Sequence, residues 1–213
     1  MPTTPPTTAC VDVLCAYLQL PFTPDPGDDS AHQEEHHRYL AFRKVRHTIL
    51  RLIGDHYRRP RGTHRSWQGC DLDLTGVTFD AGLMSFKGAA FAGSTVSFMG
   101  ATFSDGMVSF NEAVFSDGFV NFAGATFSGG MVSFSKAVLS DRVNFARATF
   151  SDGTVYFGSA AFSDGVNFDG ARFSNCRVSF NNATGPAPQG LLAALGTPAP
   201  AEVVLPASWS PVP

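Results

Sequence analysis

From Asp71 to about residue 184 the chain alternates apolar and polar positions and repeats this pattern along its length. An alanine or valine usually stands two residues before each phenylalanine, and the residue between them is mostly Ser, Thr or Asn. This period-two alternation predicts very short strands that carry both apolar side chains on one face. The gaps between successive phenylalanines alternate between five and seven residues, and the longer gap is six residues in two places. Leu139 replaces phenylalanine at one repeat position. The repeat phenylalanines are at positions 79, 86, 91, 98, 103, 110, 115, 122, 127, 134, 145, 150, 157, 162, 168, 173 and 180.

Strands this short cannot bury an apolar face alone, so successive turns of the chain must stack into a β-solenoid. Ser-Asp-Gly or Ser-Gly-Gly at residues 104, 116, 128, 151 and 163 supplies the looser corners. Four faces give a coil of 24 residues and a rod roughly 20 Å long. A two-faced coil of twelve is the alternative, which we disfavour because its flattened interior would crowd two Phe, an Ala and a Val. The predicted inward ladder comprises Phe79, Phe91, Phe103, Phe115, Phe127, Phe150, Phe162 and Phe173.

Segments of different character flank this repeat, so we divide the chain into residues 1–66, 67–184 and 185–213. Helical spacing over 10–18 and 31–57 predicts two helices, and a basic linker follows at 58–66. The second helix has an apolar stripe of Tyr39, Phe42, Val45, Ile49, Leu52, Ile53 and Tyr57. We expect these helices to cover one end of the solenoid, with Trp67 near the junction. Beyond residue 184 we expect a Pro-rich tail that caps the other end through Leu191, Leu192, Leu195, Val203, Val204, Leu205 and Trp209.

Composition indicates a soluble chain that relies on neutral polar groups. Charged residues make up only 15% and the formal net charge is −3, whereas about 25% charge is usual. Residues 1–70 hold nine Lys/Arg against seven Asp/Glu, and residues 71–184 hold six against ten. Neither a membrane helix nor a secretory signal is expected. Four cysteines without zinc-site spacing suggest reduced thiols and a cytoplasmic location.

Catalytic chemistry has little support in the sequence. A filled solenoid interior leaves no pocket, and no nucleophile motif or phosphate-binding loop is present. His32, His36 and His37 have a spacing that could bind metal, but Glu34 and Glu35 beside them favour a solvated helix start. We therefore expect no enzyme activity, no catalytic residues, no cofactor, no metal and no small-molecule substrate.

A small residue, one spacer and then Leu or Phe at five-residue steps resembles the pentapeptide-repeat family, whose consensus is A-(D/N)-L-x-x. Matching stretches include residues 70–74 (CDLDL), 101–103, 125–127 and 171–173. The resemblance implies a right-handed quadrilateral β-helix, so the fold expected is mainly β with an N-terminal helical segment and a short C-terminal cap. The alternating two-residue insertion departs from the family pattern. Residues 11–18 (VDVLCAYL), followed by residues 45–53 (VRHTILRLI), also look like the helical segment ahead of the repeats in some bacterial members. Some of those begin with membrane-spanning helices, which suggests a truncated or divergent member.

Two surfaces are candidates for interaction. On a 24-residue coil Leu83, Met107 and Met131 form an apolar column, which we expect to fold over the corner, with a docking surface as the alternative. Basic residues of the second helix and linker could meet nucleic acid or anionic lipid, although a solvated face is favoured. They are Arg43, Lys44, Arg46, Arg51, Arg58, Arg59, Arg61 and Arg65. For a third feature, a column of Asp117, Asp141 and Asp164, turn hydrogen bonding is favoured over ion binding.

Three functions follow from these features. The first is a protein-interaction scaffold, as a monomer or as a homodimer joined through the C-terminal segment. The second comes from the family resemblance, since some members mimic DNA, bind type II topoisomerases and confer quinolone resistance. Mimicry needs dense outward carboxylates, and the outward positions here are mostly Ser, Asn and Thr. The third is nucleic-acid or membrane-surface binding through the basic helix, with nucleic acid not the expected partner. We favour the scaffold, whose partner would be another protein.

Overall fold

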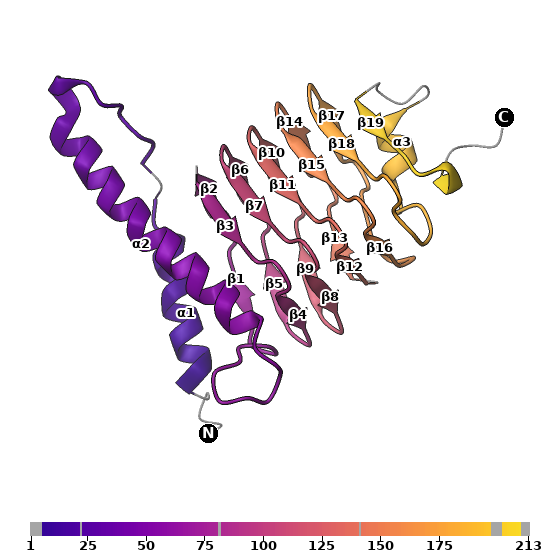
Figure 1. Ribbon diagram of the computed structural model, residues 1–213, viewed down its shortest axis with the longest axis horizontal. Coiled ribbons are helices and arrows are strands. Elements are labelled where there is room, and N and C mark those ends of the chain that lie inside the picture. Colours follow the sequence, from indigo (N-terminus) through magenta and orange to yellow (C-terminus); the bar gives the residue numbers. More distant parts are fainter. Residues whose placement is uncertain (1–5, 22, 81, 141, 197–201, 210–213) are drawn as a thin grey trace.

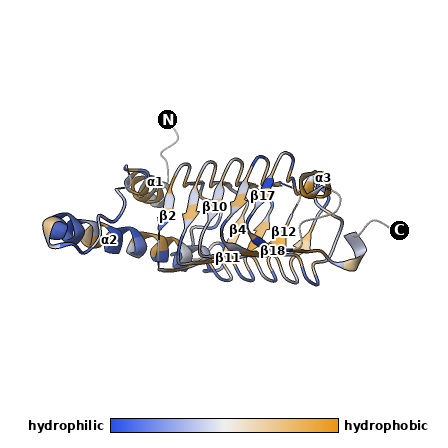
Figure 2. Cartoon of the chain, turned by 90° about the horizontal axis from the view of Figure 1, so that it is seen from above, coloured by the Kyte–Doolittle hydropathy of each residue, from blue (hydrophilic) through white to orange (hydrophobic). Residues whose placement is uncertain are grey.

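The protein is a short rod of stacked coils with helices at both ends. A computed structural model describes residues 6–21, 23–80, 82–140, 142–196 and 202–209. The coils form a β-solenoid of about five turns (Figure 1). Helices α1 (Pro6–Leu18) and α2 (Gln33–Tyr57) lie at one end, and α3 (Leu191–Leu195) lies at the other (Figure 2). No described helix combines the length and the apolar character needed to span a bilayer.

Four parallel sheets form the walls of the solenoid, and the chain visits them in a constant order. Sheet A contains β1 (Leu72–Asp73), β5 (Thr95–Ser97), β9 (Phe119–Asn121) and β13 (Val143–Asn144). Sheet B contains β2 (Thr78–Asp80), β6 (Thr102–Ser104), β10 (Thr126–Ser128), β14 (Thr149–Ser151) and β17 (Arg172–Ser174). Sheet C contains β3 (Leu83–Ser85), β7 (Met107–Ser109), β11 (Met131–Ser133), β15 (Thr154–Tyr156), β18 (Arg177–Ser179) and β19 (Val203–Val204). Sheet D contains β4 (Ala90–Ala92), β8 (Val114–Ser116), β12 (Val138–Leu139) and β16 (Ala161–Phe162).

Strand register establishes the length of the coil. In sheet B Phe79 pairs with Phe103, and Phe103 pairs with Phe127, so each coil spans 24 residues there. Phe127 then pairs with Phe150 and Phe150 with Phe173, which are steps of 23. The four-sided coil is therefore confirmed and the twelve-residue alternative is wrong. The shorter coils coincide with the two six-residue gaps of the repeat, and the inward residues keep their register.

The solenoid interior is a continuous aromatic core. Phe122 is fully buried and stacks on Phe98 at 4.6 Å and on Phe145 at 4.8 Å between ring centroids. It also meets Phe110 and Phe134 edge-on, at 5.9 and 5.6 Å. Offset stacking along the axis and edge contacts across it are the favoured geometries for aromatic rings. The buried alanines and valines fill the space that remains beside the rings.

Seven of the eight predicted ladder phenylalanines are buried, and Phe173 is the exception. Phe173 is only partly buried because β17 is the last strand of sheet B. No further coil covers its outer edge, and the short helix α3 packs there instead. The repeat pattern predicts which side a residue faces, but it cannot show where the stack ends.

The two-residue corners between sheets explain the Asp-Gly pairs. Asp105 and Gly106 both adopt positive φ, at 53° and 69°. Such a turn favours Asp or Asn followed by Gly. At the next coil a Cβ on Gly130 would lie 2.5 Å from the Gly106 carbonyl oxygen, so the stacked corners leave no room for a side chain. Glycine at these corners is required both by backbone conformation and by close packing of coils.

The N-terminal helices close the first coil, as expected. Helix α1 contacts β1, and α2, which follows a short 3-10 turn (Ser30–His32), contacts β3. Tyr57 is fully buried and its ring lies 5.0 Å from that of Phe91. The predicted stripe of α2 is wrong at Val45 and Leu52, which are exposed, because the buried side of the helix is rotated toward Leu50.

Arg46 was expected to belong to the basic surface, and that expectation is wrong. Its side chain is 1% exposed. One nitrogen of its guanidinium donates to the Leu18 carbonyl oxygen at 2.7 Å, and another donates to the Thr78 carbonyl oxygen at 2.8 Å. Burial lowers the pKa of Arg46 from its ordinary value, and the Asp80 carboxylate opposes that shift. Arg46 therefore joins α1, α2 and the first strand of sheet B.

The C-terminal segment caps the other end. Strand β19 adds to sheet C beyond β18, and a 3-10 turn (Ala207–Trp209) follows. Trp209 is buried, donates from Nε1 to the Gly185 carbonyl oxygen at 2.9 Å, and meets the ring of Phe162 at 5.2 Å. Leu191 and Leu195 are buried as well, whereas Leu192 is exposed. The predicted tail also includes residues 197–201 and 210–213, which lie outside the described residues.

The thiols should differ in reactivity because they differ in burial. Cys10 is exposed, whereas burial raises the pKa of Cys15 to about 11 and raises the pKa of Cys176. Since the thiolate is the reactive form, we expect Cys15 and Cys176 to react with a thiol reagent at pH 8 at least about tenfold more slowly than Cys10. Stopped-flow absorbance with a disulfide reagent, on the native protein and on a Cys10→Ser variant, measures this. Equal rates in native and denatured protein would contradict the buried placement.

Candidate functional site

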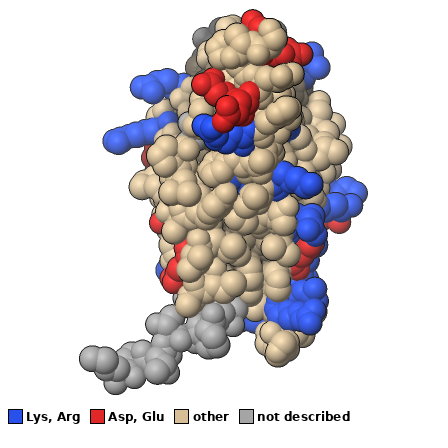
Figure 3. Space-filling view, turned by 90° about the vertical axis from the view of Figure 1, so that its left-hand side faces the viewer, with Lys and Arg blue, Asp and Glu red and all other residues tan. Residues whose placement is uncertain are grey.

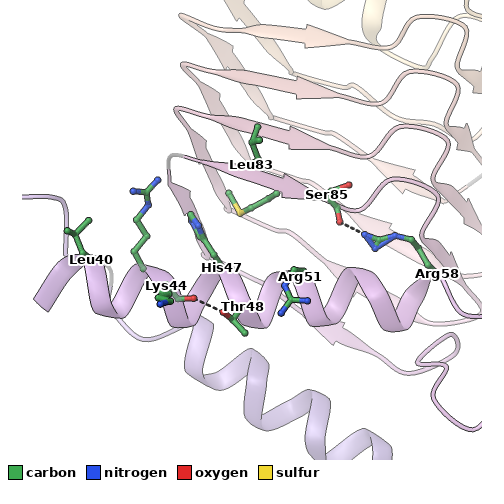
Figure 4. Close-up of a pocket in the computed structure, with 10 residues that line it drawn as sticks. Leu40, Lys44, His47, Thr48, Arg51, Arg58, Leu83 and Ser85 are labelled. Atoms are coloured by element: carbon green, nitrogen blue, oxygen red, sulfur yellow. Dashed lines mark hydrogen bonds between the residues drawn. The ribbon is translucent and has the colours of Figure 1, made fainter. Parts of the chain in front are cut away.

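A groove lies where helix α2 packs along β3, the edge strand of sheet C. Its volume is about 510 Å³, and one wall is α2 while the other is strand β3 (Figure 4). The predicted surface residues Arg43, Lys44, Arg51 and Leu83 all line this groove. The sequence placed them on two separate surfaces. The lining residues are Leu40, Arg43, Lys44, His47, Thr48, Arg51, Arg58, Leu83, Met84 and Ser85.

The helical wall is one face of α2. Leu40, Lys44, His47 and Arg51 follow one another at steps of four, three and four, which places them on the same side of the helix. Another side of α2 is buried against α1 and the first coil. Leu40 is 40% exposed, so the groove wall has an apolar position as well as charges. This spacing in the sequence was a usable signal for Leu40 and His47, which sequence reasoning missed.

The strand wall comes from β3, where side chains alternate between the two faces. Met84 points into the core and is buried, whereas Leu83 points outward and is 81% exposed. The Ser85 carbonyl oxygen accepts a hydrogen bond from Nη2 of Arg58 at 2.9 Å. A single exposed leucine is common on protein surfaces, so the significance of Leu83 depends on whether apolar neighbours extend it into a patch.

Leu83 begins an apolar ridge that continues along sheet C. Strand pairing places Leu83 beside Met107 and Met107 beside Met131, and we call these three residues the ridge. Met107 is 38% exposed, and Met131 is half-buried. The expectation that these side chains fold over the corner is wrong for Leu83. In the next coil Thr154 takes this position, so the ridge ends after the third strand.

Helix α2 is fixed against the solenoid, which makes the groove a preformed feature. A Cβ at Gly54 would lie 2.7 Å from the Ser85 carbonyl oxygen, so this glycine permits close approach of helix and strand. The Tyr39 hydroxyl donates to Oδ2 of Asp80 at 2.9 Å, and Nε of Arg43 lies 3.7 Å from the same oxygen. Burial, followed by the bond to the Asp80 carboxylate, raises the pKa of Tyr39 to about 12.

The groove carries an excess of positive charge. Arg58 lies 3.2 Å and Arg51 3.5 Å from Asp55, and the latter pair is largely exposed. Lys44 is exposed, and no ion pair joins it to any acidic side chain in the described part of the chain. Together with Arg43 the groove has four cations, and within the described residues their ion pairs are limited to Asp55 and Asp80. Basic side chains gather along the right-hand flank of this end of the molecule, with a few acidic ones between them (Figure 3).

Two other predicted constellations lie away from the groove. Nδ1 of His36 pairs with Asp25 at 2.7 Å. The Gly27 backbone N–H, followed by the His36 side chain, lowers the pKa of Asp25. Within the ranges that the structure describes, no three His, Cys, Asp or Glu side chains gather as a metal site would require. Of the acidic column, Asp117 and Asp164 lie at corners, and Asp141 lies outside the described residues.

A family model matches the C-terminal part of the solenoid. Residues 134–184 match the family model described as pentapeptide repeats (9 copies). This part of the β-solenoid therefore consists of pentapeptide repeats. Strands before residue 134 also pair inward residue with inward residue, at steps of 24 residues where strands within the matched range use 23. Their gaps of five and seven depart from a pure five-residue repeat. No curated protein matches the chain in sequence. The pentapeptide-repeat solenoid is typically non-catalytic. Solenoids commonly act through binding at their extended outer surfaces.

Proposed function

We propose that this pentapeptide-repeat protein is a scaffold that binds another protein through the groove and the adjoining ridge. The observation that carries the proposal is the exposed apolar row of Leu83, at 81%, and its strand neighbour Met107, which begins at a preformed groove. Contact with a protein partner would remove Leu83, Leu40 and Met107 from water, which is favourable by about 25 cal/mol for each Å² of apolar surface. Methionines suit such a surface because their flexible side chains adapt to a partner.

The character of the other faces supports a scaffold over a DNA mimic. Within the described strands the acidic residues are Asp73 and Asp80, and Asp80 is buried beside α2. A duplex presents two negative charges about every 3.4 Å of its axis. A wall of Ser, Thr and Asn side chains does not reproduce that charge density.

Burial and pairing also weaken the case for a nucleic-acid or membrane site on α2. Arg46 is buried, and Arg43 and Arg58 already contact Asp80 and Asp55. Only part of the basic set in the sequence is therefore available to a polyanion or to anionic lipid.

Site-specific photo-crosslinking tests the proposal. A photoreactive amino acid placed at Leu83 or Met107 should capture a partner protein in an extract of cells that naturally produce the chain. The same group at Thr126 on sheet B is the matched control, because that strand position also faces outward. The captured partner, once purified, should bind the wild-type chain in calorimetry and should bind a Leu83→Glu variant at least about tenfold more weakly. Equal capture at Leu83 and Thr126, or unchanged affinity of the variant, would contradict the proposal.

A further inference from the structure

The geometry points to one kind of occupant for the groove: we propose that it receives an acidic amphipathic α-helix of a partner protein. This inference rests on the proposed function and specifies the chemistry of the partner. Three features carry it, namely the helical spacing of one wall, the apolar positions on both walls and the sign of the charge between them.

The wall formed by α2 has the spacing used when one helix packs on another. Leu40, Lys44, His47 and Arg51 recur at the steps of four and three that define a packing seam along a helix. On α2 this seam faces the groove, while another side of the helix is buried against α1 and the first coil. A second helix lying along α2 would thus find a complementary row of positions, as amphipathic helices do in apolar grooves.

Apolar positions stand on both walls of the groove. Leu40 comes from α2 and Leu83 from β3, and both are drawn with their side chains at the groove in Figure 4. An amphipathic helix carries apolar side chains on one stripe, so one stripe can contact both leucines at once. Met107 extends the apolar surface beyond the groove mouth.

The positive charges of the groove determine that the polar side chains of the partner helix should be acidic. Lys44 and Arg51 lie in the same seam as Leu40, and within the described chain only Asp55 pairs with Arg51. Carboxylates flanking the apolar stripe of the partner would meet these two cations, whereas a basic helix would be repelled. A nucleic acid fits less well, because the described lining residues include no Phe, Tyr or Trp for base stacking.

Fluorescence anisotropy with a labelled synthetic peptide of about 20 residues tests the inference. The first peptide carries leucine at alternating steps of three and four residues, so that the leucines form one stripe of a helix. Glutamate occupies the positions on either side of that stripe. A second peptide has the same composition in scrambled order, and a third has lysine in place of glutamate. We expect binding of the first peptide only, with affinity that falls as salt is raised.

Charge reversal in the protein locates the binding. The Lys44→Glu, Arg51→Glu double variant should weaken binding of the acidic peptide by about tenfold and should favour the lysine peptide. The Arg172→Glu, Arg177→Glu double variant is matched in charge, and both residues are exposed at the far end of the solenoid, so it should bind like wild type. A Leu83→Glu variant tests the apolar contact independently, and thermal unfolding by circular dichroism checks that each variant is folded.

The outcomes separate this inference from the proposed function. Equal loss in both double variants, or equal binding of the scrambled peptide, overturns the acidic helix as occupant. Binding of phosphatidylserine vesicles or duplex DNA in place of the peptide, abolished by the Lys44 and Arg51 reversals, also overturns it. If photo-crosslinking at Leu83 still identifies a partner while the acidic peptide fails, the scaffold function stands and the helix inference falls.

Discussion

Replacing Phe122 by alanine is expected to lower the free energy of unfolding by about 3–5 kcal/mol. The ring is fully buried in the middle of the solenoid, stacks on Phe98 and Phe145, and meets Phe110 and Phe134 edge-on. Its removal takes away both apolar burial and packing on four sides, and neighbouring rings held by strand pairing cannot collapse into the space. Urea unfolding followed by far-ultraviolet circular dichroism measures the change.

The same experiment has a matched control on the outer face. Ser128→Ala changes an outward side chain in a neighbouring strand and should alter stability by less than about 0.5 kcal/mol. Because each coil contacts only its neighbours, loss of Phe122 should also make unfolding less cooperative and reduce the slope against urea. A Phe122→Ala protein that unfolds at the wild-type urea concentration would show that the aromatic core does not hold the coils together.

Arg46→Ala is expected to have the second largest effect, a loss of about 2–4 kcal/mol. The substitution removes the two hydrogen bonds that the guanidinium donates. The carbonyl oxygens of Leu18 and Thr78 then lose this donor at positions screened from water. Arg46→Lys should recover only part of the loss, since a single ammonium lacks the planar fork that reaches both oxygens.

Hydrogen exchange distinguishes this role from a general loss of stability. With Arg46→Ala, amides of α1 and α2 should exchange faster while those of the central coils, such as Phe127 and Val132, stay protected. Lys44→Ala, an exposed neighbour on the same helix, should leave both exchange and stability close to wild type. Matching behaviour of the two variants would mean that Arg46 does not join the helices to the solenoid.

Sequence reasoning predicted the residues of the groove better than their arrangement. Leu83 and Lys44 were both singled out, but for different reasons, one from the repeat and one from the basic helix. Nothing in the repeat shows how α2 crosses the first coil, because that crossing depends on Gly54 meeting the Ser85 carbonyl and on Arg58 bonding to it. Arg46 illustrates the same limit, since an arginine on a helix has identical local sequence signals whether it is solvated or buried.

The sequence by itself determined the solenoid and the inward placement of the repeat phenylalanines, because these follow from a short apolar and polar repeat. It favoured four sides over two, and strand register then established the four-sided coil. It also indicated helices at the N-terminal end and a cap at the other, since a solenoid must cover its ends. Only the tertiary structure decided which face of α2 is buried, where Phe173 loses its cover, and that Leu83 stands beside Lys44 and Arg51. These features depend on contacts between segments that no period relates, so they emerge only when the helices and the first coil pack together.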